Sequence, residues 1–253
     1  MLVVRWPLDM DAWFNEIATR RELSAEAEHE LLTFGFIVIP GLVKVPRLEQ
    51  LSQAYDAAVA EASPADVRVG STTTRVHDFV NRGAHFDELY VYRPVLEACS
   101  RLIGGPFKLS SLLARTLRPA SEAQPLHVDF KADGKGWPML GFIVMVDDFT
   151  TNNGATRFVP GSHKWLTVPD EVMKNPRADH EQQVLTCGPA GSVIIYNGSV
   201  WHGHTANQTN APRRSIQGSY IRRDAESAIG QTVRIRHDTL GRISALAKYV
   251  LAF

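Results

Sequence analysis

The sequence has few cysteines, no net charge and no long hydrophobic run, and each absence excludes a class of protein. Its two cysteines, Cys99 and Cys187, are too few for a disulfide framework or a Cys-rich zinc site. Lys and Arg together number 27, as do Asp and Glu, and no basic run exceeds a doublet, which argues against a nucleic-acid partner. No apolar run approaches the ~18–20 residues that span a bilayer, and residues 1–9 lack the charge order and cleavage site of a signal peptide. We therefore expect a cytoplasmic protein without a membrane partner.

The residues that are present describe a globular chain that begins with helices. Hydrophobic residues make up 44% and charged residues 21% of the 253 positions, which excludes intrinsic disorder. Ser24 is a candidate helix N-cap, with Gly35 as the helix stop. Residues 36–39 predict a short strand. Further helices are predicted over residues 46–64 and 87–102.

After Gly105 the chain changes to short runs separated by Gly, Pro, Asn and Asp. This pattern is typical of strands in a β-sandwich or barrel. The predicted strands are residues 107–117, 141–146, 155–159, 183–186, 192–196 and 215–221. Residues 239–252 fit one amphipathic helix that packs on the outside. The order of elements predicts an α+β fold in which helices buttress the strands.

Two His-x-Asp motifs occur, and their predicted surroundings separate them. His85 and Asp87 open a helical stretch, where residues two apart point about 200° from each other and cannot share a metal ion. His127 and Asp129 lie among predicted strands, where residues two apart project from the same face. We therefore predict that His127 and Asp129 are metal ligands and that His85 is structural.

A third ligand is offered by the segment Trp201-His202-Gly203-His204, which follows a predicted strand. One carboxylate and two imidazoles form the facial triad of non-heme Fe(II) oxygenases, which leaves three coordination positions open. The same ligand types hold zinc, manganese or nickel, so the residues alone do not identify the metal. His202 and His204 are both candidates for the third position.

Arg213, eleven residues after His202, indicates a carboxylate ligand. On the predicted strand, Arg213, Ser215 and Gln217 face one way and Arg214 faces the other. A polar face inside a barrel needs a polar ligand or water. Because a guanidinium group binds carboxylates through two parallel hydrogen bonds and stays charged when buried, Arg213 is a candidate clamp for an acidic co-substrate.

Taken together, these motifs resemble the phytanoyl-CoA dioxygenase family, whose members are Fe(II)- and 2-oxoglutarate-dependent oxygenases built on a double-stranded β-helix. The resemblance spans about residues 36–222 and rests on His127-Val128-Asp129, the run from Asn153 to His163, His202 with Asn207, and Pro212-Arg213. We expect a single domain over residues 1–253, with a helical part over 1–105, a jelly-roll (cupin-like) β-helix core over 106–223 and a C-terminal helix over 239–252.

The resemblance implies a role for each residue of the predicted site. His127, Asp129 and His202 would hold Fe(II), and Arg213 would bind the distal carboxylate of 2-oxoglutarate with help from Ser215. The spacings to Asn207 and Arg213 favour His202 over His204 as the ligand.

The position two residues after the distal histidine departs from the family pattern. Family members often carry a small hydroxyl residue there that helps to bind the co-substrate, whereas this chain has His204. We expect His204 to donate a hydrogen bond to 2-oxoglutarate or to lie behind the ligands. The implied reaction uses O2 and 2-oxoglutarate, releases succinate and CO2, and oxidises an unactivated C–H bond of a small organic molecule in secondary metabolism, with hydroxylation the leading outcome.

Two other classes of protein fit part of the pattern. A catalytically silent β-helix binding module, or a metal protein without 2-oxoglutarate chemistry, would be favoured by loss of a triad residue or of Arg213, and none is lost. A metal-dependent hydrolase needs a general base, and no second carboxylate stands near the triad in the sequence.

Overall fold

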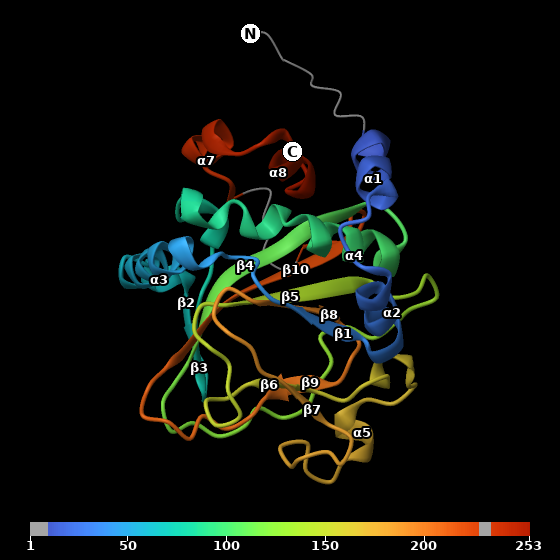
Figure 1. Ribbon diagram of the computed structural model, residues 1–253, viewed down its shortest axis with the longest axis vertical. Helices are drawn as coiled ribbons and strands as arrows, with labels where there is room; N and C mark the ends of the chain where they lie inside the picture. Colours follow the sequence, from blue (N-terminus) through green and yellow to red (C-terminus); the bar gives the residue numbers. More distant parts are fainter. Residues whose placement is uncertain (1–9, 228–233) are drawn as a thin grey trace.

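A computed structural model describes residues 10–227 and 234–253 of the chain (Figure 1). Residues 1–9, in which the sequence argues against a signal peptide, lie outside the described residues. Within the described ranges, no helix is long and apolar enough to cross a membrane.

Two antiparallel sheets form the centre of the molecule, and neither closes into a barrel. The larger sheet has the strand order β1-β8-β5-β10-β4-β3-β2, and the smaller sheet has the order β7-β6-β9. The strands of the larger sheet are β1 (Phe36–Ile39), β2 (Val67–Val69), β3 (Thr73–Val76), β4 (Phe107–Leu117), β5 (Met139–Met145), β8 (Val193–Asn197) and β10 (Arg213–Arg222). The smaller sheet consists of β6 (Thr156–Phe158), β7 (Val184–Thr186) and β9 (His202–His204).

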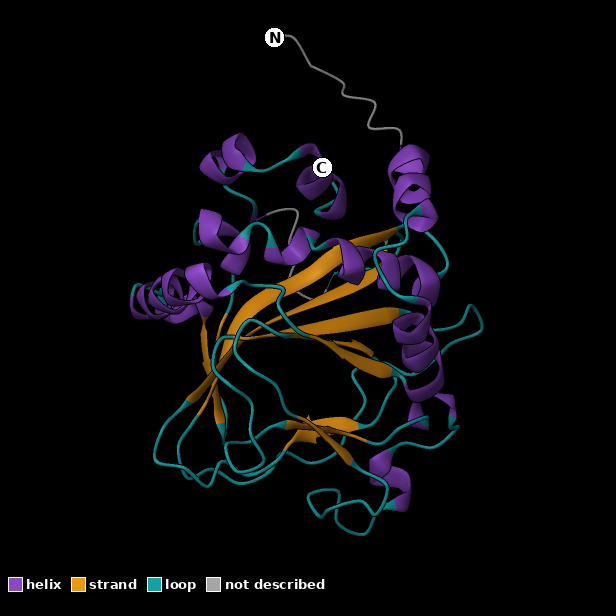
Figure 2. Cartoon of the chain, in the orientation of Figure 1, coloured by secondary structure: helices purple, strands orange, loops and turns teal. Residues whose placement is uncertain are grey.

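Helices cover the outer face of the larger sheet, and the smaller sheet lies on its other side (Figure 2). The described α-helices are α1 (Met10–Thr19), α2 (Ala25–Phe34), α3 (Val45–Ala60), α4 (Arg93–Ile103), α5 (Pro169–Val172), α7 (His237–Arg242) and α8 (Ala245–Val250). Helix α4 contacts β5, β10 and β4. This arrangement confirms the predicted α+β class, a jelly roll buttressed by helices.

Strand β10 shows how the two faces of the larger sheet differ. Ile216 and Tyr220 belong to the apolar core under the helices. Arg213, Gln217 and Ser219 instead line a pocket between the two sheets. The alternation of side chains along a strand therefore gives one strand an apolar outer face and a polar inner face.

Several predicted elements are confirmed. Ser24 caps α2, because its hydroxyl accepts a hydrogen bond from the backbone N–H of Ala27, and Gly35 ends the helix with a φ of 90°. The strand predicted over residues 107–117 has the same bounds as β4.

Other predicted elements need correction. The helix expected over 87–102 begins only at Arg93, because Pro94 occupies its first turn, and 3-10 turns precede it at Ala84–Phe86 and Leu89–Val91. The part over 1–105 was expected to be mainly helical, but it also contributes β1, β2 and β3 to the larger sheet.

The single C-terminal helix expected over 239–252 is two short helices instead. The backbone is extended at Ile243 and Ser244, and the Ser244 hydroxyl accepts from the backbone N–H of Ala247, so it caps α8. The organisation of the chain as one domain stays a prediction.

Candidate active site

The two sheets bring together the three residues predicted as metal ligands. His127 and Asp129 lie between β4 and β5, and His202 begins β9. Two backbone hydrogen bonds join the histidines, from the N–H of each to the carbonyl oxygen of the other, both at 3.0 Å. One possible ligand atom from each of the three side chains lies within 4.8 Å of the others. His127 was expected on a strand but forms only an isolated bridge with His202, and Asp129 lies in a bend; the ligand atoms of the two motif residues still converge with that of His202.

The imidazole rings are oriented so that one nitrogen of each faces Asp129. Nδ1–H of His127 donates to the carbonyl of Pro125 at 3.0 Å, and Nδ1–H of His202 donates to that of Val200 at 2.9 Å. The remaining Nε2 atoms lie 3.9 Å and 3.7 Å from the carboxylate oxygens of Asp129. Burial, and next the neighbouring His202, lowers the pKa of His127 to about 4, so this ring is neutral at pH 7. Neutral imidazoles with a fixed Nδ1–H are suited to metal binding through Nε2.

Tyr196, which the sequence did not indicate, holds the carboxylate of the triad. Its hydroxyl donates to Oδ2 of Asp129 at 2.9 Å, and its ring centroid lies 4.8 Å from that of His202. Gly141 on β5 makes room for this ring, because a Cβ there would lie 2.2 Å from Cζ of Tyr196. The pairing of Gly141 with Tyr196 across β5 and β8 could be found only with the strand register known.

Arg213 is buried at one end of the same pocket, and its side chain has unused hydrogen-bond donors. Only 2% of its surface is exposed, and its guanidinium carbon lies 3.9 Å from the centroid of the Phe149 ring. Among the described residues, its Nε and Nη1 atoms have no hydrogen-bond partner. Burial, and next Arg115, lowers its pKa to about 9, so the group still carries its charge at neutral pH. This buried cation is suited to binding a carboxylate.

Arg214 has the opposite orientation, as the predicted alternation requires. It forms ion pairs with Asp147 at 2.6 Å and with Asp56 at 2.7 Å. Of the adjacent residues Arg213 and Arg214, Arg213 is therefore the one that faces the pocket.

Ser215 and His204, the other two residues predicted to bind the co-substrate, differ in their relation to the pocket, because only His204 is part of its lining. Ser215 is fully buried, and its hydroxyl donates to the carbonyl of Arg115 at 3.2 Å. His204 lines the pocket, where its Nδ1–H donates to the carbonyl of Thr205 and its Nε2 accepts from the hydroxyl of Thr72 at 3.0 Å. Burial lowers the pKa of His204 to about 3, so its ring is neutral. His204 is not part of the cluster formed by His127, Asp129 and His202.

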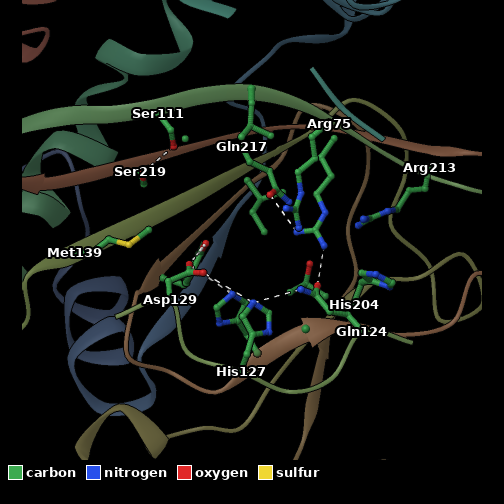
Figure 3. A pocket seen from close by; sticks show the side chains of 18 of the residues that line it. Arg75, Ser111, Gln124, His127, Asp129, Met139, His204, Arg213, Gln217 and Ser219 are labelled. Atoms are coloured by element: carbon green, nitrogen blue, oxygen red, sulfur yellow. Dashed lines mark hydrogen bonds and ion pairs between the residues drawn. The ribbon is translucent and has the colours of Figure 1, made fainter. Parts of the chain in front are cut away.

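The pocket has a volume of about 220 Å³ and a largely polar lining (Figure 3). Besides the predicted residues, it is lined by Arg75, Arg115, Gln124 and Gln217. These residues come from β3, β4, the segment before His127, and β10, so only the assembled sheet brings them together. His85 lies elsewhere, exposed in a 3-10 turn, and its structural role stays a prediction.

Comparison with known proteins identifies the family. A family model described as phytanoyl-CoA dioxygenase (PhyH) matches residues 32–215, which include the triad and Arg213. The chain belongs to the phytanoyl-CoA dioxygenase family.

Curated relatives of this PhyH chain are named as dioxygenases. Dioxygenase FUM3 of Gibberella moniliformis is 31% identical over 205 residues, which cover 71% of this chain and 65% of FUM3. Dioxygenase sphC of Aspergillus fumigatus is 27% identical over 199 residues, which cover 73% of this chain and 53% of sphC. The PhyH chain thus spans between half and two thirds of the length of these relatives.

Solved structures share the fold of this PhyH chain. The α-ketoglutarate-dependent carbocyclase SnoK from nogalamycin biosynthesis aligns with a TM-score of 0.68 at 17% identity, over 85% of this chain and 92% of SnoK. HygX from Streptomyces hygroscopicus, solved with nickel, 2-oxoglutarate and hygromycin B, aligns with a TM-score of 0.65 at 18% identity, over 81% of this chain and 90% of HygX. At these identities the likeness establishes the fold.

Proposed function

We propose that this chain is an Fe(II)- and 2-oxoglutarate-dependent oxygenase that oxidises an unactivated C–H bond of a small organic molecule in secondary metabolism, with hydroxylation as the leading outcome. The observation that carries the proposal is the presence, in one pocket, of a His-Asp-His cluster and a buried arginine with unused donors. Membership of the PhyH family supports it. We also propose a cytoplasmic location, with which two free cysteines are compatible.

The residues of the pocket fit the metal and the co-substrate. Two imidazole nitrogens and one carboxylate oxygen leave coordination positions open, as non-heme iron oxygenases require. In the proposal, His127, Asp129 and His202 hold the iron, and Arg213 binds the distal carboxylate of 2-oxoglutarate. Ser215 was predicted to assist Arg213 directly; in the proposal it acts through the backbone of β4, because its hydroxyl bonds the carbonyl of Arg115. His204, predicted to donate to 2-oxoglutarate or to lie behind the ligands, lines the cavity.

The chemistry supplied by iron and 2-oxoglutarate at such a site is O2-dependent oxidation of a C–H bond, coupled to decarboxylation of 2-oxoglutarate to succinate and CO2. The protein contributes geometry and environment. Tyr196 fixes one oxygen of Asp129, and the bonds from Nδ1 fix both histidine rings.

Anaerobic titration of the protein with Fe(II) and 2-oxoglutarate tests the function. The expected result is a weak visible charge-transfer band that develops only when both are present, followed by succinate formation when O2 is admitted. Iron binding without this band would overturn the oxygenase and favour the alternative, a β-helix protein that binds metal or ligand without 2-oxoglutarate chemistry.

A further inference from the structure

The pocket is lined by three guanidinium groups and by one carboxylate. The arginines are Arg75, Arg115 and Arg213, and Asp129 is the one acidic side chain among the described residues of the lining (Figure 3). Arg75 on β3 and Arg115 on β4 are direct partners in the strand register. Like charges in this arrangement repel each other. Within residues 10–227 and 234–253, none of the three arginines forms an ion pair with an acid at 4.0 Å or less.

Arg115 is held at the pocket wall by two neutral side chains. One of its terminal nitrogens donates to Oε1 of Gln217 at 3.3 Å, and the other donates to Oε1 of Gln124 at 2.7 Å. Each terminal nitrogen carries two hydrogens, so each keeps one N–H for a further acceptor. Burial, and next Arg75, lowers the pKa of Arg115 to about 10, which leaves it charged at neutral pH. The two glutamines therefore orient the planar guanidinium fork of Arg115 without neutralising its charge.

The co-substrate cannot balance all of this positive charge. 2-Oxoglutarate has two carboxylates, whereas the pocket has three guanidinium groups, and a divalent cation more than offsets Asp129. At least one guanidinium is therefore left without an anion when metal and co-substrate are bound. A buried charge without a partner is destabilising, so a pocket with a surplus cation favours a further anion.

Position within the pocket distinguishes Arg115 from Arg213. Arg213 lies against Phe149 at one end. Arg115 is tied to Gln217, which lies further along β10, and beyond it Ser219 and Ser111 continue the polar lining toward Met139 (Figure 3). The Arg115 fork thus lies between Gln217 on β10 and Gln124, whose side-chain amide nitrogen lies 3.4 Å from Nε2 of the predicted metal ligand His127.

Building on the proposed function, we propose that the organic substrate is a carboxylic acid and that Arg115, oriented by Gln217 and Gln124, binds its carboxylate. A planar guanidinium fork with one free N–H on each terminal nitrogen matches the two oxygens of a carboxylate. The substrate's acidic group then anchors the molecule beside the metal ligands and leaves its C–H bonds to face them.

Matched pairs of ligands test this assignment by binding. The probes are small alkyl and aryl carboxylic acids, each paired with its primary amide, titrated by NMR into protein loaded with nickel(II) and 2-oxoglutarate. For at least one pair, the acid should bind wild type about tenfold or more tightly than its amide. Arg115→Gln should reduce the affinity for that acid to that for the amide. Arg68→Gln, which removes an exposed arginine of the same sheet outside the pocket lining, should leave the preference unchanged.

Two results would overturn the assignment while leaving the proposed function intact. One is wild-type protein that takes up 2-oxoglutarate but shows no preference for any acid over its amide. The other is a loss of 2-oxoglutarate affinity in Arg115→Gln as large as that in Arg213→Ala, which would assign Arg115 to the co-substrate. If wild type loaded with nickel(II) does not bind 2-oxoglutarate, the proposed function itself fails.

Arg115→Lys provides a second variant if Arg115→Gln does not fold. It keeps the charge but loses the planar fork. The expected result is at least a threefold weaker affinity for the acid with an unchanged affinity for the amide. Affinity for the acid equal to that of wild type would overturn the proposed contact.

Discussion

The hydroxyl of Tyr196 donates a hydrogen bond to Oδ2 of Asp129 at 2.9 Å, so a residue of the larger sheet orients a carboxylate that stands in a loop. The ring that carries this hydroxyl packs against His202 and is accommodated by the missing side chain of Gly141. Carboxylates that bind metals are commonly oriented by such outer hydrogen bonds.

Removal of the hydroxyl with the ring retained should weaken metal binding. In Tyr196→Phe we expect the affinity for nickel(II) to fall about 10- to 100-fold, because Asp129 is then free to rotate. Isothermal titration of the metal-free protein measures this. Tyr55→Phe is the matched control, since its hydroxyl bonds Thr116 and not the triad. Equal affinities of Tyr196→Phe and wild type would show that the hydroxyl does not orient the ligand.

Alanine substitutions at His202 and at His204 should show which of the two histidines binds the metal. His202→Ala should abolish metal binding, because it removes one of three clustered ligand atoms. His204→Ala should retain most of it, because Nε2 of His204 accepts from Thr72 and does not join the cluster. Nickel(II) content after dialysis is the measurement. The reverse pattern would reassign the third ligand to His204.

The two adjacent arginines of β10 should differ in co-substrate binding. Arg213→Ala should weaken binding of 2-oxoglutarate to the nickel(II) protein about 10- to 100-fold, since a charge-assisted pair is lost. Arg214→Ala should leave this affinity unchanged, because Arg214 pairs with Asp147 and Asp56. Calorimetry of 2-oxoglutarate binding measures both. A larger loss in Arg214→Ala would contradict the orientation of the strand.

Acid should destabilise the protein partly through His204. The pKa of this ring is about 3 in the folded protein against 6.5 as its ordinary value, because burial disfavours its charged form. The unfolded chain therefore binds the extra proton first. The stability present above pH 6.5 is lost as pH falls from 6.5 toward 3, by up to about 1.4 kcal/mol per pH unit.

Urea unfolding of wild type and His204→Gln at pH 7, 6 and 5 checks this contribution. Glutamine does not titrate, so the free energy of unfolding of the variant should fall less steeply with acid. Other buried histidines, such as His163, act alike in both proteins and cancel in the comparison. Parallel pH dependences would rule out the contribution of His204.

Local signals in the sequence were sufficient for elements whose stability is local. Ser24 and Gly35 predicted both ends of α2, because a cap and a stop act within one turn. The break between α7 and α8 was missed, because Ser244 caps the second helix within a pattern that an uninterrupted helix also fits. The short strands β2 and β3 were also missed, since β2 pairs with β3 and β3 pairs with β4, which lies far along the chain.

The same distinction applies to the site. Motif spacing predicted the triad and the arginine of the pocket, because metal binding by His and Asp and carboxylate binding by Arg can be recognised from the residue types alone. Tyr196 and the pairing of Arg75 with Arg115 depend on strand register, which the spacing of motifs does not determine. His127 was predicted on a strand but forms a single bridge to His202, and its ligand atom still lies within 4.8 Å of those of Asp129 and His202.

That bridge has a consequence for the choice of metal. The backbone hydrogen bonds between His127 and His202 belong to the polypeptide, so the fold itself holds these two residues side by side. A set of two imidazoles and a carboxylate binds nickel and copper more tightly than Fe(II), following the general order of stability for divalent metals. If the proposed function holds, a correctly folded molecule can be loaded with a metal that does not support oxidation, and the active fraction of a preparation depends on which ions bind before iron.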